Sequence, residues 1–434
     1  MIQNTAKIAY ISFDTLPSHK GAAVHIESFV RALAQQYGTV ELVTVAAIAP
    51  KTPAKTVNWS GVNHTVLPAM GKTLIDRVMC FRRHLHMWLQ EQCFDVIQIR
   101  SIFEGFVVAK VQQQRQHNSL QPLYQQLIFE VNGLPSIELK YRYPKVANDW
   151  ELMHKLRLQE HICLRAADTI VTPSAITKQY LKEYLKEHLQ EYLKEYLKEY
   201  LSEPLKTHGQ DLLRQGIRRN IQVIPNGVDL SVMTYQPPRE TIKTLNMLYF
   251  GTLSAWQGVG LATEALALYR RDFDARLTII GPTRGKQVAQ LKKLANKLKV
   301  TASMQILEAR PQAELVQFMH QADIILAPLK PNDRNLVQGC CPLKVLEGMA
   351  SGTPVITSDL PVVTQLGESE HHFLAVQPGS AKAIKDGLLR LREDAPLRLR
   401  LSQTGRSHIE NHYTWQHAHH HLQQIYHQHF SQEL

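Results

Sequence analysis

Short apolar runs alternate with longer amphipathic stretches along almost the whole chain. Each run is rich in Ile, Val and Leu and has the length of a buried strand, and most are separated by a segment that can form a helix. The first series of candidate strands is Ile8–Phe13, Val40–Val45, Val96–Ile99, Leu127–Phe129, Thr169–Val171 and Ile221–Ile224. The second series is Met247–Phe250, Leu277–Ile280, Ile324–Ala327, Val355–Thr357 and Phe373–Val376. This alternation predicts α/β architecture, with parallel sheets covered by helices on both faces.

The two series are separated by Tyr235–Arg239, which contains the paired prolines Pro237 and Pro238. Paired prolines favour an extended linker over a helix or a central strand. We therefore expect an N-terminal domain over residues 1–234, a linker over 235–240, a C-terminal domain over 241–410 and a last helical segment over 411–434. The carboxyl ends of the strands should supply ligand loops on both sides of an interdomain cleft.

A repeat of Tyr-Leu-Lys-Glu runs from Tyr180 to Leu201. A period of four favours a helix, but the Tyr/Leu stripe drifts around the helix axis with every repeat. The lysines of the repeat are balanced by glutamates, so no basic face results. We interpret the segment as a solvated helical insertion, within residues 178–216, that is dispensable for chemistry; the alternative is an interaction helix.

Charge and cysteine content narrow the classes of partner and compartment. Lys and Arg outnumber Asp and Glu by 49 to 38, which gives a net charge of +11 and favours anionic partners, whether phosphates, an anionic membrane or nucleic acid. The five cysteines lack metal-ligand spacing, which favours a reducing compartment. No secretory signal pattern is evident, and no apolar run approaches the roughly 20 residues of a spanning helix. We expect a cytoplasmic protein, at most peripheral on the inner face of a membrane.

Two glycine-containing turns follow candidate strands and precede candidate helices. Gly21 and Ala22 lie between the first strand and its helix, and Gly251 and Thr252 follow the strand that ends at Phe250. Small residues at such a turn let backbone amides approach a phosphate at the helix N-terminus. Ordinary strand-to-helix connections have the same pattern, so the turns alone do not decide between the two interpretations.

The segment Gly339–Val355 carries the most specific motif. Pro342 suits the first turn of a helix, and Lys344 lies close to the same N-terminus, where its charge opposes the helix dipole. A bound anion would remove that conflict. Glu347 follows three residues later, near the same helix face. A lysine for phosphate and a carboxylate for ribose hydroxyls together favour a nucleotide-diphosphate site, although a surface Lys and Glu on an amphipathic helix is the simpler alternative.

Taken in order, five segments resemble the retaining glycosyltransferase family 4, which has the GT-B fold. These are Val223–Asp229, Gly251–Gly258, Ile279–Pro282, Ala322–Ile324 and Pro342–Val355. The resemblance covers nearly the whole chain except the Tyr-Leu-Lys-Glu repeat, and it includes Tyr413–Trp415 and the helix that follows. It implies two Rossmann-like domains with a cleft between them and a C-terminal helix that crosses back to the N-terminal domain.

The resemblance also implies an activity and its ligands. The expected reaction moves a sugar, with retention, from a nucleotide-diphosphate sugar to a saccharide or lipid-linked acceptor, in the synthesis of cell-surface polysaccharide or glycolipid. No cofactor, metal or nucleic acid is expected. The residues implied as catalytic are Glu130, His25 and Lys344. The residues implied as donor-binding are Gly21, Ala22, Gly251, Thr252, Gly281, Arg284, Leu343, Lys344 and Glu347.

Some positions depart from the family pattern. Of the family's two glutamates, Glu347 matches the second, whereas Gly339 stands at the position of the first, as in a variant with Pro-Leu-Lys before the second glutamate. Thr252 and Gln257 stand where Arg and Lys are common, and Glu130 stands where many members have histidine. A nucleotide-sugar epimerase of the same fold and a non-catalytic scaffold on a decayed transferase fold are therefore alternatives.

Two further features invite functional interpretations. His417 and His421 have the i,i+4 spacing of metal ligands, but simple helix packing is the preferred interpretation. The stretch from Arg77 to Leu89, which includes Arg82 and Arg83, is basic and aromatic, and such helices can lie on an anionic membrane. An ordinary packed helix with a solvated arginine face is the alternative.

Overall fold

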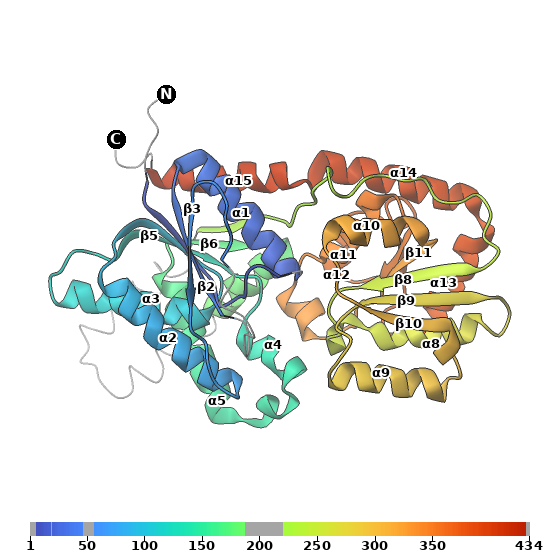
Figure 1. Ribbon diagram of the computed structural model, residues 1–434, viewed down its shortest axis with the longest axis horizontal. Helices are drawn as coiled ribbons and strands as arrows, with labels where there is room; N and C mark the ends of the chain where they lie inside the picture. The colour runs from blue at the N-terminus through green and yellow to red at the C-terminus, as the bar shows by residue number, and fades with distance from the viewer. Residues whose placement is uncertain (1–5, 19, 47–55, 187–219, 431–434) are drawn as a thin grey trace. The chain divides into compact units, whose positions relative to one another are not determined.

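The computed structural model describes residues 6–18, 20–46, 56–186 and 220–430 (Figure 1). The chain forms two compact units. The first contains residues 1–18, 22–224 and 421–434, and the second contains residues 19–21 and 225–420. Each unit is built around one parallel sheet, which confirms the predicted α/β architecture of two Rossmann-like domains.

The sheet of the first unit has seven strands in the order β3-β2-β1-β4-β5-β6-β7. Its strands are β1 (Ile8–Ile11), β2 (Val40–Val45), β3 (Val62–Leu67), β4 (Phe94–Ile99), β5 (Tyr124–Glu130), β6 (Thr169–Thr172) and β7 (Asn220–Val223). Its helices are α1 (Gly21–Tyr37), α2 (Leu74–Gln90), α3 (Ile102–His117), α4 (Pro135–Arg142), the short η1 (Pro144–Asn148), α5 (Trp150–Ala166) and residues 175–186. Helices α2, α3 and α5 pack side by side on one face, and α1 covers the other (Figure 1).

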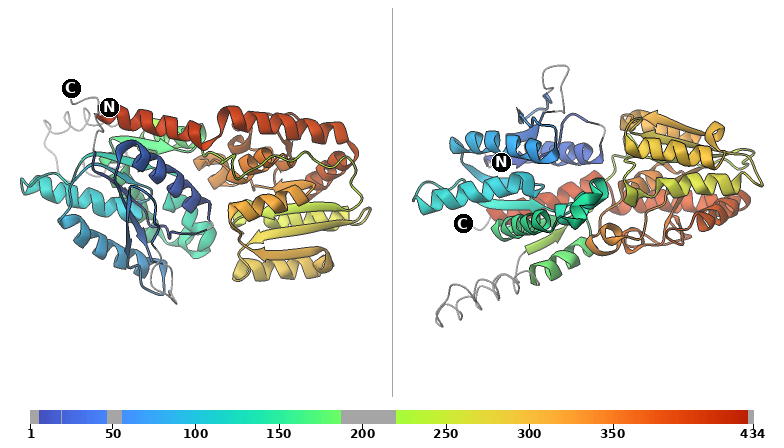
Figure 2. Two further views of the ribbon diagram at one scale, coloured as in Figure 1. Left: turned by 45° about the horizontal axis from the view of Figure 1, so that its top comes forward. Right: turned by 90° about the horizontal axis from the view of Figure 1, so that it is seen from below.

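The sheet of the second unit has six strands in the order β10-β9-β8-β11-β12-β13. These are β8 (Leu245–Phe250), β9 (Ala275–Gly281), β10 (Met304–Glu308), β11 (Ile324–Ala327), β12 (Val355–Ser358) and β13 (Leu374–Val376). Helices α8 (Val259–Tyr269) and α9 (Lys286–Lys297) lie on one face, and α10 (Gln312–Gln321) and α11 (Leu343–Ser351) lie on the other (Figures 1 and 2). The remaining elements are η2 (Ala255–Gln257), η3 (Thr301–Ser303), η4 (Arg334–Gln338), α12 (Pro361–Thr364), α13 (Ala381–Glu393), α14 (Ala395–His412) and α15 (Trp415–Phe430).

Two strands were not predicted from the sequence, β3 and β10. Each lies at an edge of its sheet, and most of its residues are only partly buried. An edge strand needs no continuous apolar run because one side of its backbone and part of its surface remain in water. The central strands, such as β1 with all of its residues buried, are the ones that the apolar pattern located.

The long segment of the second unit, residues 225–420, has its two ends side by side. Val228 of the incoming chain pairs with Thr414 of the outgoing chain, and the Val228 amide donates to the Tyr413 carbonyl oxygen over 2.8 Å. A Cβ on Gly227 would collide with the Trp415 backbone, so this close approach requires glycine. The expected linker at 235–240 lies inside the second unit, where the Gln236 amide donates to the Ser351 carbonyl oxygen over 3.0 Å.

The last helix, α15, returns to the first unit from residue 421 onward. The Tyr426 hydroxyl donates to Gln98 Oε1 at 2.8 Å, and the Tyr426 ring packs against that of Tyr37, on α1. This return confirms the implied crossover of the C-terminal helix. His417 lies in the first turn of α15, where its Nδ1 is 2.7 Å from Thr414 Oγ1. No group of three or more metal-ligating side chains occurs in the described parts of the chain.

The start of the Tyr-Leu-Lys-Glu repeat differs from the expected solvated insertion. Leu181, Tyr184 and Leu185 are buried in the core of the first unit. The Tyr184 hydroxyl donates to Glu160 Oε2 at 2.8 Å. The interpretation as a solvated insertion is therefore wrong for these residues, because they contribute core surface and a buried hydrogen bond. Residues 187–201 of the repeat lie outside the described residues.

Candidate functional site

Lys344 lies in the first turn of α11, close to the carboxyl end of β8. The residue is only 8% exposed, and Nζ donates to Gln257 Oε1 at 3.1 Å. Nζ also lies 3.6 Å from the centre of the Tyr249 ring, close enough for a cation–π interaction. Burial lowers the pKa of Lys344 to about 7, although the charge of Glu347 acts in the opposite direction. The side chain therefore sits near the midpoint of its titration at neutral pH.

Glu347 lies on the next turn of the same helix and is equally buried, at 8% exposure. It accepts a hydrogen bond from Gln312 Nε2, on α10, at 2.7 Å. Burial raises the pKa of Glu347 to about 7, against the lowering effects of the Gln312 hydrogen bond and the Lys344 charge. A buried lysine and a buried carboxylate with opposed pKa shifts are typical of functional sites.

Glycines bring the loops after β8 and β9 together beside this pair. Gly251, directly after β8, has a φ of +106°, and an ideal Cβ built there would lie 3.9 Å from Lys344 Cε. A Cβ on Gly281, the last residue of β9, would collide with the Gly251 carbonyl oxygen. Glycine at position 281 thus allows the close approach of the two loops, and the exposed Gly251 leaves its backbone accessible next to Lys344, as a phosphate-binding loop requires.

Three further predicted donor-site residues belong to loops and a helix of the second unit. Thr252 follows Gly251 and is exposed, and its carbonyl oxygen accepts from the Tyr249 hydroxyl at 2.6 Å. Leu343 is the first residue of α11, directly before Lys344. Arg284 lies on the exposed loop between β9 and α9.

The loop before α11 is held by residues that sequence reasoning did not assign to the site. Asn226 Nδ2 donates to the Cys341 carbonyl oxygen at 2.9 Å, and Gln365 Nε2 donates to that of Cys340 at 3.1 Å. The Arg334 guanidinium donates to the Gly339 carbonyl oxygen. These contacts fix the approach to the α11 N-terminus from three separate parts of the second unit.

Gly339 explains the missing first glutamate of the family pattern. Its φ of +85° and ψ of 167° fall in a region that only glycine adopts readily. A glutamate at this position would strain the backbone by roughly 1–3 kcal/mol unless the loop changed its conformation. The loop conformation at this position therefore favours glycine over glutamate.

In the first unit, Glu130 at the end of β5 is the centre of a buried polar cluster. His25 Nε2, on α1, and Arg100 Nε, after β4, each lie 2.9 Å from Glu130 Oε1. The Tyr10 hydroxyl donates to Oε2 at 2.7 Å, and Gln98 Nε2 donates to the same oxygen at 2.9 Å. Burial by itself would raise the pKa of Glu130, but the charges of His25 and Arg100 and these hydrogen bonds hold it well below its usual range.

The environment of Glu130 indicates what this carboxylate does. The residue is 2% exposed, and both of its oxygens are occupied by neighbouring side chains. Arg100 continues the network to Asp14 Oδ2 at 3.0 Å, and the Asp14 side chain is 39% exposed. Glu130 therefore orients Arg100 and His25, while Asp14 presents the cluster to solvent. Gly21 and Ala22 form the first turn of α1, which also carries His25.

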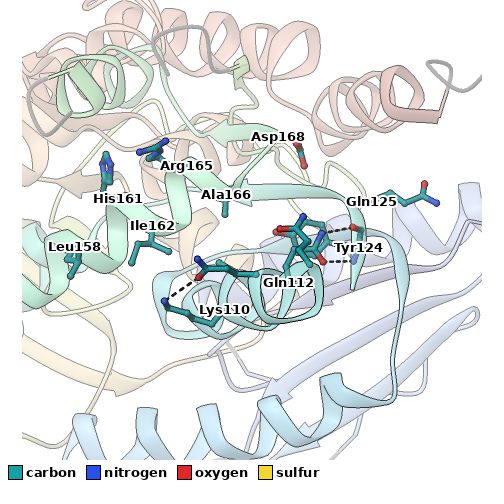
Figure 3. Close-up of a pocket in the computed structure, with 13 residues that line it drawn as sticks. Lys110, Gln112, Tyr124, Gln125, Leu158, His161, Ile162, Arg165, Ala166 and Asp168 are labelled. Atoms are coloured by element: carbon teal, nitrogen blue, oxygen red, sulfur yellow. Dashed lines mark hydrogen bonds between the residues drawn. The ribbon is translucent and has the colours of Figure 1, made fainter. Parts of the chain in front are cut away.

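A cavity of about 600 Å³ lies elsewhere in the first unit, between α3, β5 and α5 (Figure 3). It contains none of the predicted site residues. The amide of Gln112 bonds to the backbone of Tyr124, and Lys110 Nζ donates to Gln113 Oε1 at 3.4 Å. Its polar walls thus bond partly to one another, and the chemistry assembled around Lys344 favours that position as the candidate site.

Comparisons with known proteins show which families the two halves of the chain match. Residues 237–408 match the family described as glycosyl transferases group 1, and residues 19–189 match that described as glycosyltransferase family 4. The chain is 28% identical over 225 residues to a D-inositol 3-phosphate glycosyltransferase of Corynebacterium aurimucosum, a match that covers 48% of this chain and 51% of the relative. The chain thus spans about half the length of the curated relatives it matches.

Two solved structures share the fold over nearly their whole length. Sucrose-phosphate synthase from Thermosynechococcus elongatus has a TM-score of 0.72 at 17% identity and covers 98% of this chain and 99% of that one. Anabaena HepE, solved in complex with UDP-glucose, has a TM-score of 0.65 at 14% identity, with 97% and 99% covered. The two parallel-sheet domains, the glycine-lined Lys344 site and both family matches lead to one conclusion. The chain carries a domain of glycosyltransferase family 4 over residues 19–189 and a domain of the glycosyl transferases group 1 over residues 237–408.

Proposed function

We propose that this protein transfers a sugar from a nucleotide-diphosphate sugar to a saccharide or lipid-linked acceptor, with retention of anomeric configuration. The observation that carries the proposal is the buried Lys344, whose pKa burial lowers to about 7, beside the exposed backbone of Gly251. A bound diphosphate would stabilise the protonated form of such a lysine, because the anion supplies a negative charge in place of the water that burial removes. The UDP-glucose complex of HepE supports a nucleotide sugar as the donor class.

In the proposed reaction, the bond between the anomeric carbon and the diphosphate oxygen breaks, and its electron pair stays on the departing nucleotide diphosphate. Protonated Lys344 would stabilise the charge that develops on that oxygen, together with the amides at the N-terminus of α11. The acceptor hydroxyl would bond to the anomeric carbon on the same face, and its proton would pass to the departing phosphate oxygen. Glu347 would accept hydrogen bonds from the ribose hydroxyls.

The Glu130 cluster would serve the sugar or acceptor side of the reaction. With its own oxygens occupied, Glu130 would act as a positioning residue that keeps Arg100 and His25 in place. Because Lys344 supplies positive charge at the leaving group, we expect transfer to proceed without an added metal ion. A lipid-linked acceptor, as in cell-surface polysaccharide or glycolipid synthesis, would bring the protein to an anionic membrane surface.

Calorimetry and a transfer assay test the proposal. The protein is titrated with UDP, GDP and ADP and with the matching sugar nucleotides, and each donor is then incubated with and without saccharide acceptors. A nucleotide diphosphate at a hundredfold excess over its Kd should stabilise the fold by about 2.7 kcal/mol. Sugar release that depends on an acceptor supports the transferase. Donor conversion without any acceptor supports an epimerase, and the absence of nucleotide binding supports a non-catalytic scaffold.

A further inference from the structure

Helix α9 and the loop before it concentrate positive charge on the surface of the second unit (Figure 1). Residues 284–299 include one arginine and five lysines, but no Asp or Glu. All six basic side chains are exposed: Arg284, Lys286, Lys292, Lys293, Lys297 and Lys299. Charge of one sign at this density favours an anionic partner.

These charges are not neutralised within the protein. No ion pair in the described part of the chain involves a basic residue of 284–299, and the ion pairs closest in sequence, Arg270–Asp274 and Arg310–Glu314, lie before and after the segment. Lys293 and Lys297 are one helical turn apart, a spacing at which like charges destabilise a helix. A bound anion would remove this repulsion.

Polar side chains share one stripe along α9. The stripe consists of Lys286, Gln290, Lys293 and Lys297, at spacings of four, three and four residues. The opposite face is buried and fixes the helix to the second unit through Val288, Leu291 and Ala295. The stripe extends over about 16 Å of the helix axis. Its last three residues, with Leu294 and Asn296, line a groove of about 510 Å³, so the surface suits an extended chain better than a single small ion.

The stripe begins at the edge of the second unit that carries the candidate donor site. Lys286 is the first residue of α9, which follows β9 and its last residue, Gly281. Gly281 closely approaches Gly251, next to Lys344. Loops at the carboxyl ends of parallel strands form the ligand-binding edge of a sheet, and the helix after each strand runs back from that edge. A chain bound along the stripe therefore has one end on the donor-site side of the unit.

The composition of this surface distinguishes among anionic partners. Residues 284–299 contain no Phe, Tyr or Trp, whereas single-stranded nucleic acid stacks its bases on aromatic side chains. None of the large exposed apolar side chains in the described ranges belongs to this segment, so it lacks the apolar face that enters a bilayer. Interfaces between proteins are depleted in lysine. Exposed lysines beside amide side chains suit a hydrophilic chain that carries carboxylates and hydroxyls.

We propose that the α9 stripe binds an acidic glycan, a linear saccharide chain with carboxylate groups, and holds it as the acceptor. Lys286, Lys293 and Lys297 pair with the carboxylates, and the amides of Gln290 and Asn296 bond to hydroxyls. The choice of a glycan, and its role as acceptor, rest on the proposed transfer to a saccharide. The anionic character of the ligand follows from the stripe itself.

Direct binding to the full chain, without donor, tests the proposal. Labelled oligogalacturonate supplies the carboxylates, and the same oligosaccharide with its carboxylates methyl-esterified is the uncharged control. The acidic form should bind about tenfold more tightly, and added salt should weaken its binding because salt screens charge. Equal affinity for the two forms, or no binding, overturns the proposal. Tighter binding of a single-stranded DNA with the same number of charges overturns the assignment to a glycan.

Two variants of equal net charge locate the surface. Lys286→Gln/Lys293→Gln/Lys297→Gln should weaken oligogalacturonate binding about tenfold, because each exposed ion pair contributes a factor of about two to five. Lys72→Gln/Lys145→Gln/Lys382→Gln removes the same number of exposed lysines elsewhere and should bind as wild type does. An equal loss in both variants contradicts the location of the site on α9.

Further measurements separate this surface from the fold and from the proposed transferase. Circular dichroism and UDP affinity should be unchanged in both variants, and a loss of either in the α9 variant overturns the assignment of these lysines to a glycan. Binding of oligogalacturonate through α9 without any sugar transfer refutes the proposed function but not the glycan surface. In transfer to an acidic acceptor, the α9 variant should raise KM about tenfold and leave kcat unchanged. An unchanged KM overturns the role of the stripe in holding the acceptor.

Discussion

Replacement of Lys344 by methionine should make the ligand-free protein more stable while it abolishes donor binding. The pKa of Lys344 falls from its ordinary value of 10.5 to about 7 in the folded protein. At neutral pH the unfolded chain carries this proton, and folding removes it from a large fraction of the molecules. Each pH unit between these two values corresponds to about 1.36 kcal/mol. The burial of Lys344 therefore costs roughly 4 kcal/mol at pH 7.

Methionine has a similar length and no charge, so Lys344→Met removes this cost. The variant also loses the hydrogen bond to Gln257, worth about 1 kcal/mol, and Glu347 loses a positive neighbour that lowers its pKa. We expect a net gain of roughly 1–3 kcal/mol at pH 7. Because the folded pKa of Lys344 lies below the unfolded one, burying Lys344 costs free energy below pH 10.5, and this cost disappears as the pH rises toward 10.5. The stability that Lys344→Met gains should therefore shrink as the pH rises from 7 to 10.5.

Urea unfolding of wild type and variant at pH 7, 8.5 and 10 measures the gain, and calorimetry with UDP measures the loss of function. Nucleotide affinity should fall at least tenfold, because a charge-assisted contact is worth about 1.5–3 kcal/mol. Lys344→Arg, which retains the charge, is the matched control for the charge requirement and should not show the gain in stability. The reasoning is refuted by a variant that is less stable than wild type at pH 7, or by one that binds nucleotide unchanged.

Three further predictions concern the site and its support. Wild-type nucleotide affinity should fall as the pH rises above about 7, because Lys344 loses its charge. Near that pH, binding should take up a proton, so the binding enthalpy measured by calorimetry should depend on the ionisation enthalpy of the buffer, whereas that of Lys344→Met should not. Asn226→Ala should weaken nucleotide binding about fivefold, since it removes the hydrogen bond that fixes the loop before α11, whereas exposed Asn296→Ala should not; equal affinities would contradict this positioning role. Glu130→Gln should destabilise the protein by about 3–5 kcal/mol because Arg100 loses its buried counter-charge. This difference in the free energy of unfolding should have its whole value above pH 4.5 and become smaller below it, as Glu130 of the wild type takes up a proton. A loss under about 1 kcal/mol, measured by urea unfolding, would show that the cluster contributes little to stability.

The alternation of apolar runs with amphipathic segments determined the architecture. Central strands such as β1 and β11 are buried along their whole length, so continuous apolar runs in the sequence predicted their positions. The edge strands β3 and β10 were not, because their residues are only partly buried. The α11 N-terminus was also predictable, since a helix start has local rules, and Lys344 and Glu347 lie within that one element.

What the sequence could not determine is how distant segments meet. Asn226 contacts Cys341 across 115 positions, and Gln257 contacts Lys344 across 87. No local pattern encodes such pairs, because they depend on the order of strands in a sheet and on the paths of the loops at their carboxyl ends. The same limit applies to charge: Arg82 and Arg83 are neighbours in the sequence, yet only the packing of α3 and α5 against α2 decides that Arg82 bonds within the fold while Arg83 is exposed. Burial and pKa arise from the whole surrounding volume, so the lowered pKa of Lys344 and the fully bonded Glu130 belong to the tertiary structure alone.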